Sequence, residues 1–206
     1  MVFIHPTAVV KTSYIGDGTY VGPFSYVSNR VVIGKNCSIY SASIGQPGEH
    51  PNGAEDKGGM VVIEDDVQIR EYVTVNAPLF TDRTRLEKGC YLMAKSHVGH
   101  DAHLKERVVL HTGAIIGGHS VIGRYCYMGL NCSTHPFAKL GDYCIVGANG
   151  VFKGISPEAL VWAGVPARPI KVNAVGLSRH AEDYEEDELR GNAEEFIGKY
   201  YVNRLT

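Results

Sequence analysis

Residues 86–152 read LEKGCYLMAKSHVGHDAHLKERVVLHTGAIIGGHSVIGRYCYMGLNCSTHPFAKLGDYCIVGANGVF, and this stretch repeats with a period of six residues. Every sixth position holds a large apolar residue, with Thr134 as the one exception. These large positions are Leu86, Leu92, Val98, Leu104, Leu110, Ile116, Ile122, Met128, Thr134, Leu140, Val146 and Phe152. A period of six fits neither a helix nor a plain alternating strand. It indicates a repeat architecture, in which each unit is one short strand and a tight turn.

The period also extends toward the N-terminus. It runs from Val9 to Ile39 and resumes at Ile63. Three six-residue units would close one coil of a parallel β-helix, so we predict an all-β solenoid. Two polar interruptions, residues 46–59 and 76–85, are expected to be loops that carry binding groups. The predicted β-helix domain spans residues 1–170, and residues 171–206 form a C-terminal capping segment. Asn192 and Glu195 predict a capping box that opens a short helix in this segment.

Small residues and glycines recur at fixed places in each unit. Four of the five cysteines occupy the small position two residues before a large one, and Cys37 occupies it in the first block. We therefore expect buried, unreactive thiols. Nine glycines directly follow large residues, and we expect them to supply positive φ angles at the corners. They are Gly16, Gly22, Gly34, Gly99, Gly117, Gly123, Gly129, Gly141 and Gly147.

Composition limits the class of protein. The chain has 206 residues and a net charge of −2, with 20 basic and 22 acidic side chains, which gives no electrostatic footprint for nucleic acid. Its apolar runs are too short for a membrane span, and its N-terminus lacks the pattern of a signal peptide. An odd number of cysteines favours reduced thiols and a cytoplasmic location.

The coil geometry predicts where the chemistry gathers. With eighteen residues per coil, residue n lies beside residue n+18. His100 then lies beside Gly118, and Asp101 beside His119. We predict that His100 is a general base, held by Asp101 or by a backbone carbonyl, and that the Gly118 N–H stabilises an oxyanion. Because no Ser or Cys nucleophile is expected nearby, this arrangement favours direct acyl transfer.

Other histidines have weaker claims to a role. His135 falls near the same edge one coil further on, and His97 lies half a repeat before His100. His5, His50, His103 and His180 are expected to be merely exposed. Histidines on adjacent coils are also compatible with zinc, but the ligand pattern of β-helical carbonic anhydrases is absent, so we predict no metal.

Several segments resemble one known family. The matching segments are IHPTAVV (4–10), VGPF (21–24), IREYVTV (69–75), LMAKSHVGHDAHL (92–104), IIGGH (115–119), STHPF (133–137) and VNAVGLSR (172–179). They resemble the hexapeptide-repeat acyltransferases, and most closely the bacterial UDP-N-acetylglucosamine 3-O-acyltransferase family of lipid A biosynthesis. The resemblance implies a left-handed parallel β-helix that forms a homotrimer. It also implies a nucleotide-sugar acceptor and an acyl thioester co-substrate, on acyl carrier protein or coenzyme A, with no bound cofactor.

The resemblance also implies residue roles. His100, Asp101 and Gly118 match the family's catalytic residues. His97, His119 and His135 match histidines that line the substrate cleft, whereas Asn173 and Arg179 match residues that hold the nucleotide. Gly147 and Ala148 fall where the family measures acyl-chain length. Arg168 lies in a segment, Ala163–Ile170, that resembles the GVPAKP ending of acetyl-CoA-dependent members.

The chain also departs from the family pattern. Asn76-Ala77-Pro78 replaces His-Arg-Gly, Pro136 replaces a glutamine, and Val175 replaces an acidic residue. The C-terminal helical region is also much shorter. We therefore predict an acyltransferase that acts on a hydroxyl or amine of a nucleotide sugar such as UDP-N-acetylglucosamine. An acetyl-CoA-dependent amino-sugar N-acetyltransferase and a non-catalytic β-helical binding module are the alternatives.

Overall fold

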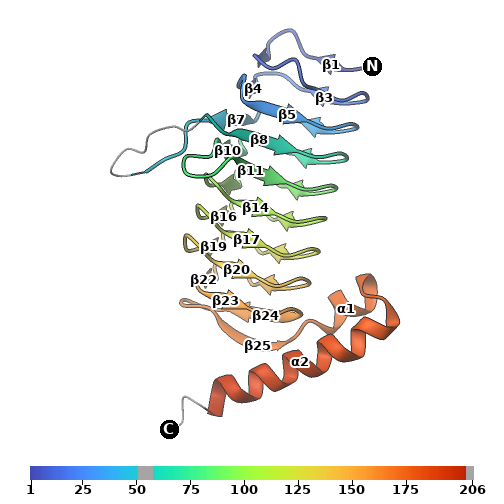
Figure 1. Cartoon of the computed structure of the whole chain (residues 1–206), viewed down its shortest axis with the longest axis vertical. Coiled ribbons are helices and arrows are strands. Elements are labelled where there is room, and N and C mark those ends of the chain that lie inside the picture. Colours follow the sequence, from blue (N-terminus) through green and yellow to red (C-terminus); the bar gives the residue numbers. More distant parts are fainter. Residues whose placement is uncertain (51–57, 203–206) are drawn as a thin grey trace.

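The computed structural model describes residues 1–50 and 58–202, and it shows a parallel β-helix. Successive coils stack along the long axis, and each coil contributes one short strand to each of three sheets (Figure 1). The predicted fold class is therefore confirmed. The predicted 46–59 loop joins β7 to β8, although its residues 51–57 lie outside the described part of the chain, and residues 77–82 join β10 to β11.

Within the described residues, the first sheet has ten strands. They are β1 (Phe3–Ile4), β3 (Tyr20–Val21), β6 (Ser38–Ile39), β9 (Gln68–Ile69), β12 (Tyr91–Leu92), β15 (Val109–Leu110), β18 (Tyr127–Met128), β21 (Ile145–Val146), β24 (Leu160–Ala163) and β25 (Arg168–Val172). Nine of these strands run parallel, and β25 turns back antiparallel to β24. The last strand of the solenoid thus reverses the regular winding.

The second and third sheets are wholly parallel over the described residues. The second contains β2 (Val9–Val10), β4 (Tyr26–Val27), β7 (Ser43–Gln46), β10 (Thr74–Asn76), β13 (His97–Val98), β16 (Ile115–Ile116), β19 (Ser133–Thr134) and β22 (Val151–Phe152). The third contains β5 (Val31–Ile33), β8 (Met60–Ile63), β11 (Arg83–Leu86), β14 (His103–Leu104), β17 (Val121–Ile122), β20 (Lys139–Leu140) and β23 (Ile155–Ser156).

The predicted eighteen-residue register is present in the regular part of the chain. Val98 pairs with Ile116, and Ile122 pairs with Leu140. Because residues 77–82 add length to one coil, Val75 pairs with Val98 across 23 residues instead. Strand pairing therefore continues on both sides of residues 77–82, with a register shift between Val75 and Asn76 where β10 pairs with β7.

The core is a column of the large residues of each repeat. Leu86, Ile116 and Phe152 are fully buried, and Thr134 is 5% exposed. Burying an aliphatic or aromatic side chain of this size contributes roughly 1.5–3 kcal/mol, so the column dominates the stability of the solenoid. All five cysteines are free and buried, as predicted.

The glycines that follow the large residues do not have the role we expected. None of the nine has a positive φ angle; instead, non-glycine residues three places after the large residue take that conformation, among them Asp101 (φ 61°) and His119 (φ 58°). At seven of the nine, all except Gly22 and Gly147, a Cβ would lie less than 3.0 Å from atoms of the neighbouring coil, so contact between coils requires glycine there. A Cβ at Gly123, for example, would lie 2.4 Å from the carbonyl carbon of Gly141 on the next coil.

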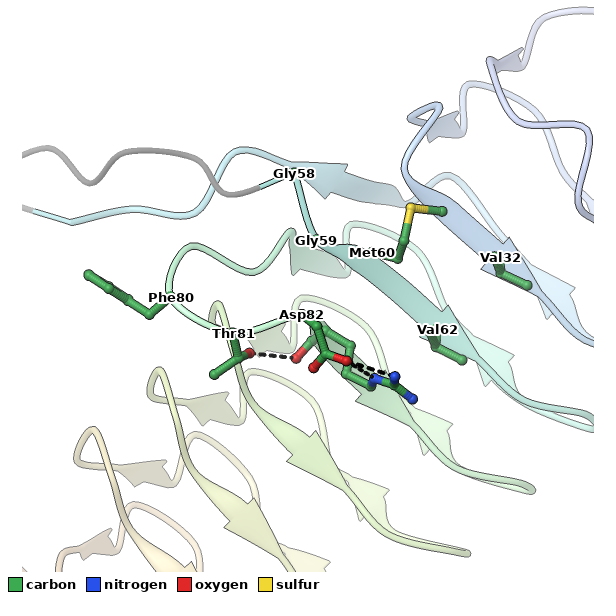
Figure 2. A pocket seen from close by; sticks show the side chains of 9 residues that line it. Val32, Gly58, Gly59, Met60, Val62, Phe80, Thr81 and Asp82 are labelled. Atoms are coloured by element: carbon green, nitrogen blue, oxygen red, sulfur yellow. Dashed lines mark hydrogen bonds and ion pairs between the residues drawn. The ribbon is translucent and has the colours of Figure 1, made fainter.

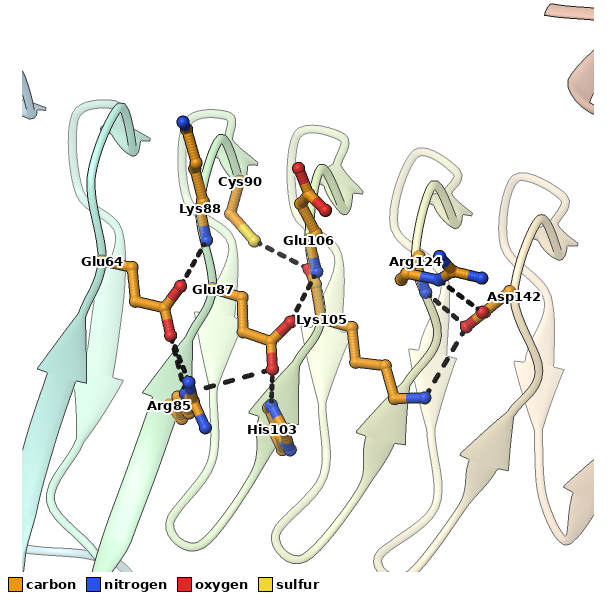
Figure 3. Close-up of polar contacts among 10 residues, drawn as sticks. All are labelled: Glu64, Arg85, Glu87, Lys88, Cys90, His103, Lys105, Glu106, Arg124 and Asp142. Atoms are coloured by element: carbon orange, nitrogen blue, oxygen red, sulfur yellow. Dashed lines mark hydrogen bonds and ion pairs between the residues drawn. The ribbon is translucent and has the colours of Figure 1, made fainter. Parts of the chain in front are cut away.

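Charged side chains link successive coils along the corner between the third and first sheets (Figure 3). Glu64 accepts hydrogen bonds from Arg85, and the Arg124 Nε lies 2.7 Å from Asp142 Oδ2. His103, which we expected to be merely exposed, is half-buried, and its Nε2 lies 2.7 Å from Glu87 Oε1. These contacts hold neighbouring corners in register, and each isolated surface pair contributes little on its own.

The C-terminal segment contains two helices, α1 (Ala174–His180) and α2 (Asp183–Val202). The second runs across the end of the solenoid below β25 (Figure 1). The predicted capping box at Asn192 is wrong, because α2 begins at Asp183 and Asn192 lies in its interior. Within the described residues, neither helix combines the length and the apolar character needed to cross a bilayer.

Candidate active site

His100 and Asp101 lie at the corner between β13 and β14, where the chain turns from the second sheet to the third. His100 Nδ1 is 2.7 Å from Asp101 Oδ2. The side chain of His100 is 12% exposed and that of Asp101 is fully buried. The His100 imidazole is thus held by the Asp101 carboxylate and not by a backbone carbonyl, the two partners that the sequence left open. This contact leaves the other ring nitrogen, Nε2, free to face a substrate.

Asp101 is also the anchor of the 77–82 loop. Its carboxylate accepts hydrogen bonds from the backbone N–H groups of Leu79, Phe80 and Thr81, and from the Thr81 hydroxyl at 2.5 Å. Its own N–H donates to the buried Thr84 hydroxyl at 2.8 Å. One side chain therefore both orients the imidazole and docks the loop.

These contacts keep Asp101 ionised. Burial alone would raise the pKa of its carboxyl group, but hydrogen bonds from Thr81, His100 and the Leu79 N–H outweigh burial and lower that pKa to about 2. A buried carboxylate with this many donors stays charged at neutral pH. It therefore places a fixed negative charge beside the His100 ring.

Gly118 and His119 lie on the next coil, as the spacing predicts. A Cβ at Gly118 would lie 2.8 Å from Nε2 of His100, so only glycine leaves room for the ring. His119 Nε2 is 3.7 Å from Asp101 Oδ2, and its ring stacks on Phe137 with centroids 4.4 Å apart. Burial lowers the pKa of His119, which therefore favours the neutral imidazole.

A cavity of about 540 Å³ opens in front of His100. Its lining consists of Glu49, His50, Phe80, His100, His119, Pro136 and Phe137. The Phe80 ring lies between three histidines, with centroids 5.3 Å from His50, 5.7 Å from His100 and 5.4 Å from His119. Five members of this lining, Glu49, His50, Phe80, Pro136 and Phe137, were not among the predicted site residues, and His50 was expected to be merely exposed.

A second cavity lies on the other side of the 77–82 loop. It measures about 620 Å³ and is lined by Val32, Met60 and Val62 of the third sheet together with residues 80–83. Phe80 lines both cavities, and Figure 2 shows its side chain pointing away from Met60 and Val62. The loop residue Phe80 thus separates the histidine cavity from an apolar groove.

His97 lies on β13, next to the corner. Its Nδ1 is 2.7 Å from the Thr74 hydroxyl, and burial lowers the pKa of its imidazole. It lines a smaller cavity of about 270 Å³ with Asn76 and Ile115. Glu49 lines this cavity as well as the one in front of His100, so the two cavities adjoin.

The other residues singled out in the sequence do not line the His100 cavity within one chain. His135 is exposed, with its Nδ1 3.2 Å from the Pro136 carbonyl oxygen. The Asn173 amide caps α1 by accepting the Gly176 N–H, and it donates to the Tyr143 carbonyl at 2.7 Å.

The residues expected to bind the donor, and Arg179, which was expected to hold the nucleotide, lie toward the C-terminal end of the solenoid. Arg168 donates to the Tyr200 hydroxyl at 3.0 Å, and Arg179 is exposed in the last turn of α1. Gly147 and the exposed Ala148 form the corner that follows β21. These residues lie further along the solenoid than His100. They could contact the same substrate as His100 only through a second chain or if the substrate is long.

One group in the site has the composition of a metal site. The ligand atoms of His100, Asp101 and His119 lie within 4.8 Å of one another. Two imidazoles and one carboxylate suit a divalent transition metal. The Asp101 carboxylate already accepts hydrogen bonds from the 77–82 loop and contacts His100. It is therefore better suited to orient the His100 imidazole than to bind a metal.

Comparison with known proteins gives consistent matches. Residues 12–44 match the family model described as bacterial transferase hexapeptide (six repeats). The acyl-[acyl-carrier-protein]–UDP-N-acetylglucosamine O-acyltransferase of Halorhodospira halophila is 31% identical over 203 residues, covering 87% of this chain and 78% of the relative. The enzyme of the same name from Thiobacillus denitrificans is 30% identical over 202 residues, with coverages of 87% and 78%.

A solved structure agrees with this. The UDP-N-acetylglucosamine acyltransferase from Campylobacter jejuni superposes with a TM-score of 0.76 at 26% identity, over 91% of this chain and 81% of the other. The left-handed parallel β-helix built from hexapeptide coils places this chain among the hexapeptide-repeat acyltransferases. Within that class, it belongs to the acyl-[acyl-carrier-protein]–UDP-N-acetylglucosamine O-acyltransferase family.

Proposed function

We propose that this protein transfers an acyl group from an acyl carrier protein thioester to a hydroxyl of UDP-N-acetylglucosamine, with His100 as the general base. The observation that carries the proposal is the hydrogen bond between His100 Nδ1 and Asp101 Oδ2, at 2.7 Å, directly against Gly118. The names of the relatives give the donor and acceptor class.

The reaction follows from this geometry in two steps. His100 Nε2 takes the proton of the acceptor hydroxyl while its oxygen attacks the thioester carbonyl carbon, and the carbonyl π electrons move to oxygen. The Gly118 N–H, which donates to no acceptor among the described residues, holds the resulting oxyanion. When the intermediate collapses, the carbon–sulfur bond breaks and the imidazolium returns its proton to the leaving thiolate.

Asp101 supports both steps. Its carboxylate holds the Nδ1–H tautomer, so that the lone pair of Nε2 faces the substrate. Its pKa of about 2 keeps it anionic throughout, and the charge stabilises the imidazolium intermediate. A covalent route through a cysteine is not supported, because burial raises the pKa of the Cys90 and Cys132 thiols to about 12.

We also propose that the enzyme is a cytoplasmic homotrimer. Ile115 on the face beside His97 is 48% exposed, and Phe137 in the cavity is 66% exposed. Apolar side chains that gather around a site in this way mark a surface covered by another chain. In that assembly the exposed Arg179 of one subunit would reach the nucleotide bound beside His100 of the next, and the buried Asn173 would contribute indirectly by capping the helix that carries Arg179. Residues 171–206 would cap each solenoid.

The remaining assignments concern the substrates. We assign His97, His119 and His135 to the walls of the acceptor and donor cleft, and Gly147, Ala148 and Arg168 to the donor end. The acyl thioester enters as co-substrate, and the proposed chemistry uses no bound cofactor. The free, buried cysteines fit a reducing compartment.

One observation favours a second acceptor class. Glu49 lines both cavities beside the catalytic histidines, and a carboxylate there attracts a protonated amine. An amino-sugar nucleotide with acetyl-CoA as donor is therefore the alternative. Amide formation would use the same base and oxyanion site, with His100 removing a proton from the attacking nitrogen.

The test is a donor–acceptor matrix followed by mass spectrometry of the product. UDP-N-acetylglucosamine and an amino-sugar nucleotide are each offered with acyl carrier protein thioesters of several lengths and with acetyl-CoA. The proposal expects ester formation on UDP-N-acetylglucosamine from acyl carrier protein. Amide formation from acetyl-CoA alone supports the alternative, and the absence of thioester cleavage in every combination contradicts both.

A further inference from the structure

Thr134 is the one polar residue in the column of large core residues between Leu86 and Phe152. It lies on β19 and is only 5% exposed. A buried hydroxyl in an apolar stack is costly unless it makes hydrogen bonds. Its partners lie on the coil that carries Gly117 and Gly118.

Elsewhere in this part of the solenoid, one backbone hydrogen bond recurs at the end of each strand. The N–H that follows a large residue donates to the carbonyl oxygen of the large residue on the next coil. Gly99 donates in this way to Ile116 at 2.8 Å, Gly123 to Leu140 at 3.0 Å and Gly129 to Val146 at 2.8 Å. The repeat therefore fixes the orientation of each corner peptide.

Gly117 departs from this pattern. Its N–H donates to the side-chain Oγ1 of Thr134 at 3.0 Å rather than to the Thr134 carbonyl. The pairing of β16 with β19 is correspondingly reduced to Ile115 with Ser133, whereas neighbouring pairs in the same sheet have two residues in register. The exception thus falls on the residue immediately before Gly118.

The hydroxyl groups form a chain with one direction. Ser120 Oγ, which is fully buried, lies 3.2 Å from the His135 carbonyl oxygen, and that oxygen only accepts. Ser120 therefore donates to His135, and Thr134 Oγ1 donates to Ser120 Oγ at 3.1 Å. Thr134 is then left to accept the Gly117 N–H, which completes the chain without an unsatisfied proton.

We propose that Thr134 is a positioning residue for the oxyanion site. By drawing the Gly117 N–H to its hydroxyl, Thr134 sets the orientation of the peptide between Ile116 and Gly117. Through the backbone of Gly117 it also sets the orientation of the next peptide, whose Gly118 N–H faces the reacting carbonyl. The Gly117 carbonyl is held from the other side by the Ser120 N–H at 3.3 Å. This inference rests on the proposed acyl-transfer function. It adds the Thr134 hydroxyl as the group that orients the oxyanion donor, the Gly118 N–H.

Two substitutions separate this role from a structural one. Thr134→Val restores an apolar residue to the column and permits the regular bond from Gly117 to the residue-134 carbonyl, so the thermal midpoint should equal or exceed that of the wild type. We expect kcat for thioester cleavage to fall about tenfold, with KM for donor and acceptor unchanged, because the oxyanion donor is misaimed. Thr134→Ser keeps the hydroxyl and should recover kcat to within about threefold, although the lost methyl group lowers the midpoint.

Valine should therefore lower kcat without lowering the thermal midpoint, whereas serine should lower the midpoint with little loss of kcat. Thr112→Val, the same substitution at an exposed corner, should leave kcat unchanged. Wild-type kcat in Thr134→Val would overturn the proposal. So would a loss of kcat that follows the loss of stability and is not recovered by serine.

A measurement that needs no substrate keeps this inference separate from the proposed function. The backbone amide resonances of Gly117 and Gly118 should shift in Thr134→Val and return toward wild-type positions in Thr134→Ser. Unchanged resonances in the valine variant would overturn the positioning role, whatever the enzyme acylates. Lack of thioester cleavage by the wild type, together with the expected amide shifts, would overturn the acyl-transfer function alone.

Discussion

The imidazole of His100 occupies the space that a side chain at Gly118, one coil away, would need. A Cβ at position 118 would lie 2.8 Å from both Cε1 and Nε2 of the ring, closer than van der Waals contact allows. The position opposite the base is thus restricted to glycine by the base itself.

Gly118→Ala should therefore inactivate the enzyme by displacing His100. We expect kcat/KM to fall by about 100-fold or more, since a shift of about 1 Å in a catalytic group has this effect. Gly191→Ala is a suitable control, because nothing lies within 4 Å of a Cβ there. That control should leave activity unchanged and stabilise α2 by roughly 0.5–1 kcal/mol. Steady-state kinetics of the two variants test this prediction. Wild-type activity in Gly118→Ala would show that a side chain at position 118 does not displace His100.

Asp101 should make stability depend on pH in the acid range. Its pKa is about 2 in the folded protein against a usual 3.8, so the unfolded chain binds the proton more readily. The contribution is present above about pH 4 and is lost as the pH falls through about 2; it amounts to about 2 kcal/mol. The difference in the free energy of unfolding between wild type and Asp101→Asn, measured with urea, should shrink by that amount as the pH falls from about 4 to about 2. A difference independent of pH would show that the carboxylate is not held as described.

Gly123 tests the role of the corner glycines. Its Cβ would come within 2.4 Å of the Gly141 carbonyl carbon, and backbone cannot yield as a side chain does. Gly123→Ala should lower the free energy of unfolding by roughly 1–3 kcal/mol through overpacking between coils. If Gly123 were instead needed for a positive φ angle, Gly123→Asn would be tolerated better than alanine, because asparagine enters that conformation more easily. Denaturant unfolding of both variants distinguishes the two causes, and we expect asparagine to be at least as disruptive.

The five cysteines should be unreactive in the native protein. All are buried, and burial raises the pKa of the Cys37, Cys90 and Cys132 thiols. A thiol reagent such as Ellman's should therefore titrate none of them rapidly in native protein and all five in denaturant. Rapid reaction of one thiol in the folded state would reopen a covalent mechanism.

The regular repeat made much of the site predictable. Because one coil is eighteen residues, the sequence alone placed Gly118 beside His100 and His119 beside Asp101, and the structure contains both contacts. The period also assigned the cysteines to the core. A periodic pattern fixes which residues are neighbours wherever the backbone pairing is continuous.

The parts that escaped prediction lie where the period stops. Phe80 and His50 belong to the two interruptions, which have no register to follow. Phe80 reaches His100 because the 77–82 loop docks on Asp101, and the ring centroid of His50 lies 6.4 Å from that of His100. The reason why glycine is needed at the corners also could not be predicted. A glycine required for a positive φ angle and a glycine required by close contact between coils give the same sequence pattern. The start of α2 was misplaced because local capping signals at Asn192 compete with packing of the whole helix against β25.

The central claim is that His100 performs the proton transfer in acyl transfer, and single-turnover thioester cleavage by His100→Ala tests it most directly. The assay would use the donor and acceptor pair identified for the wild type, with light scattering and circular dichroism to verify the folded assembly. We expect a folded variant whose rate falls by about 100-fold or more, since a positioned base contributes about 10²–10⁴-fold to the rate. A folded His100→Ala enzyme that turns over at close to the wild-type rate would contradict it.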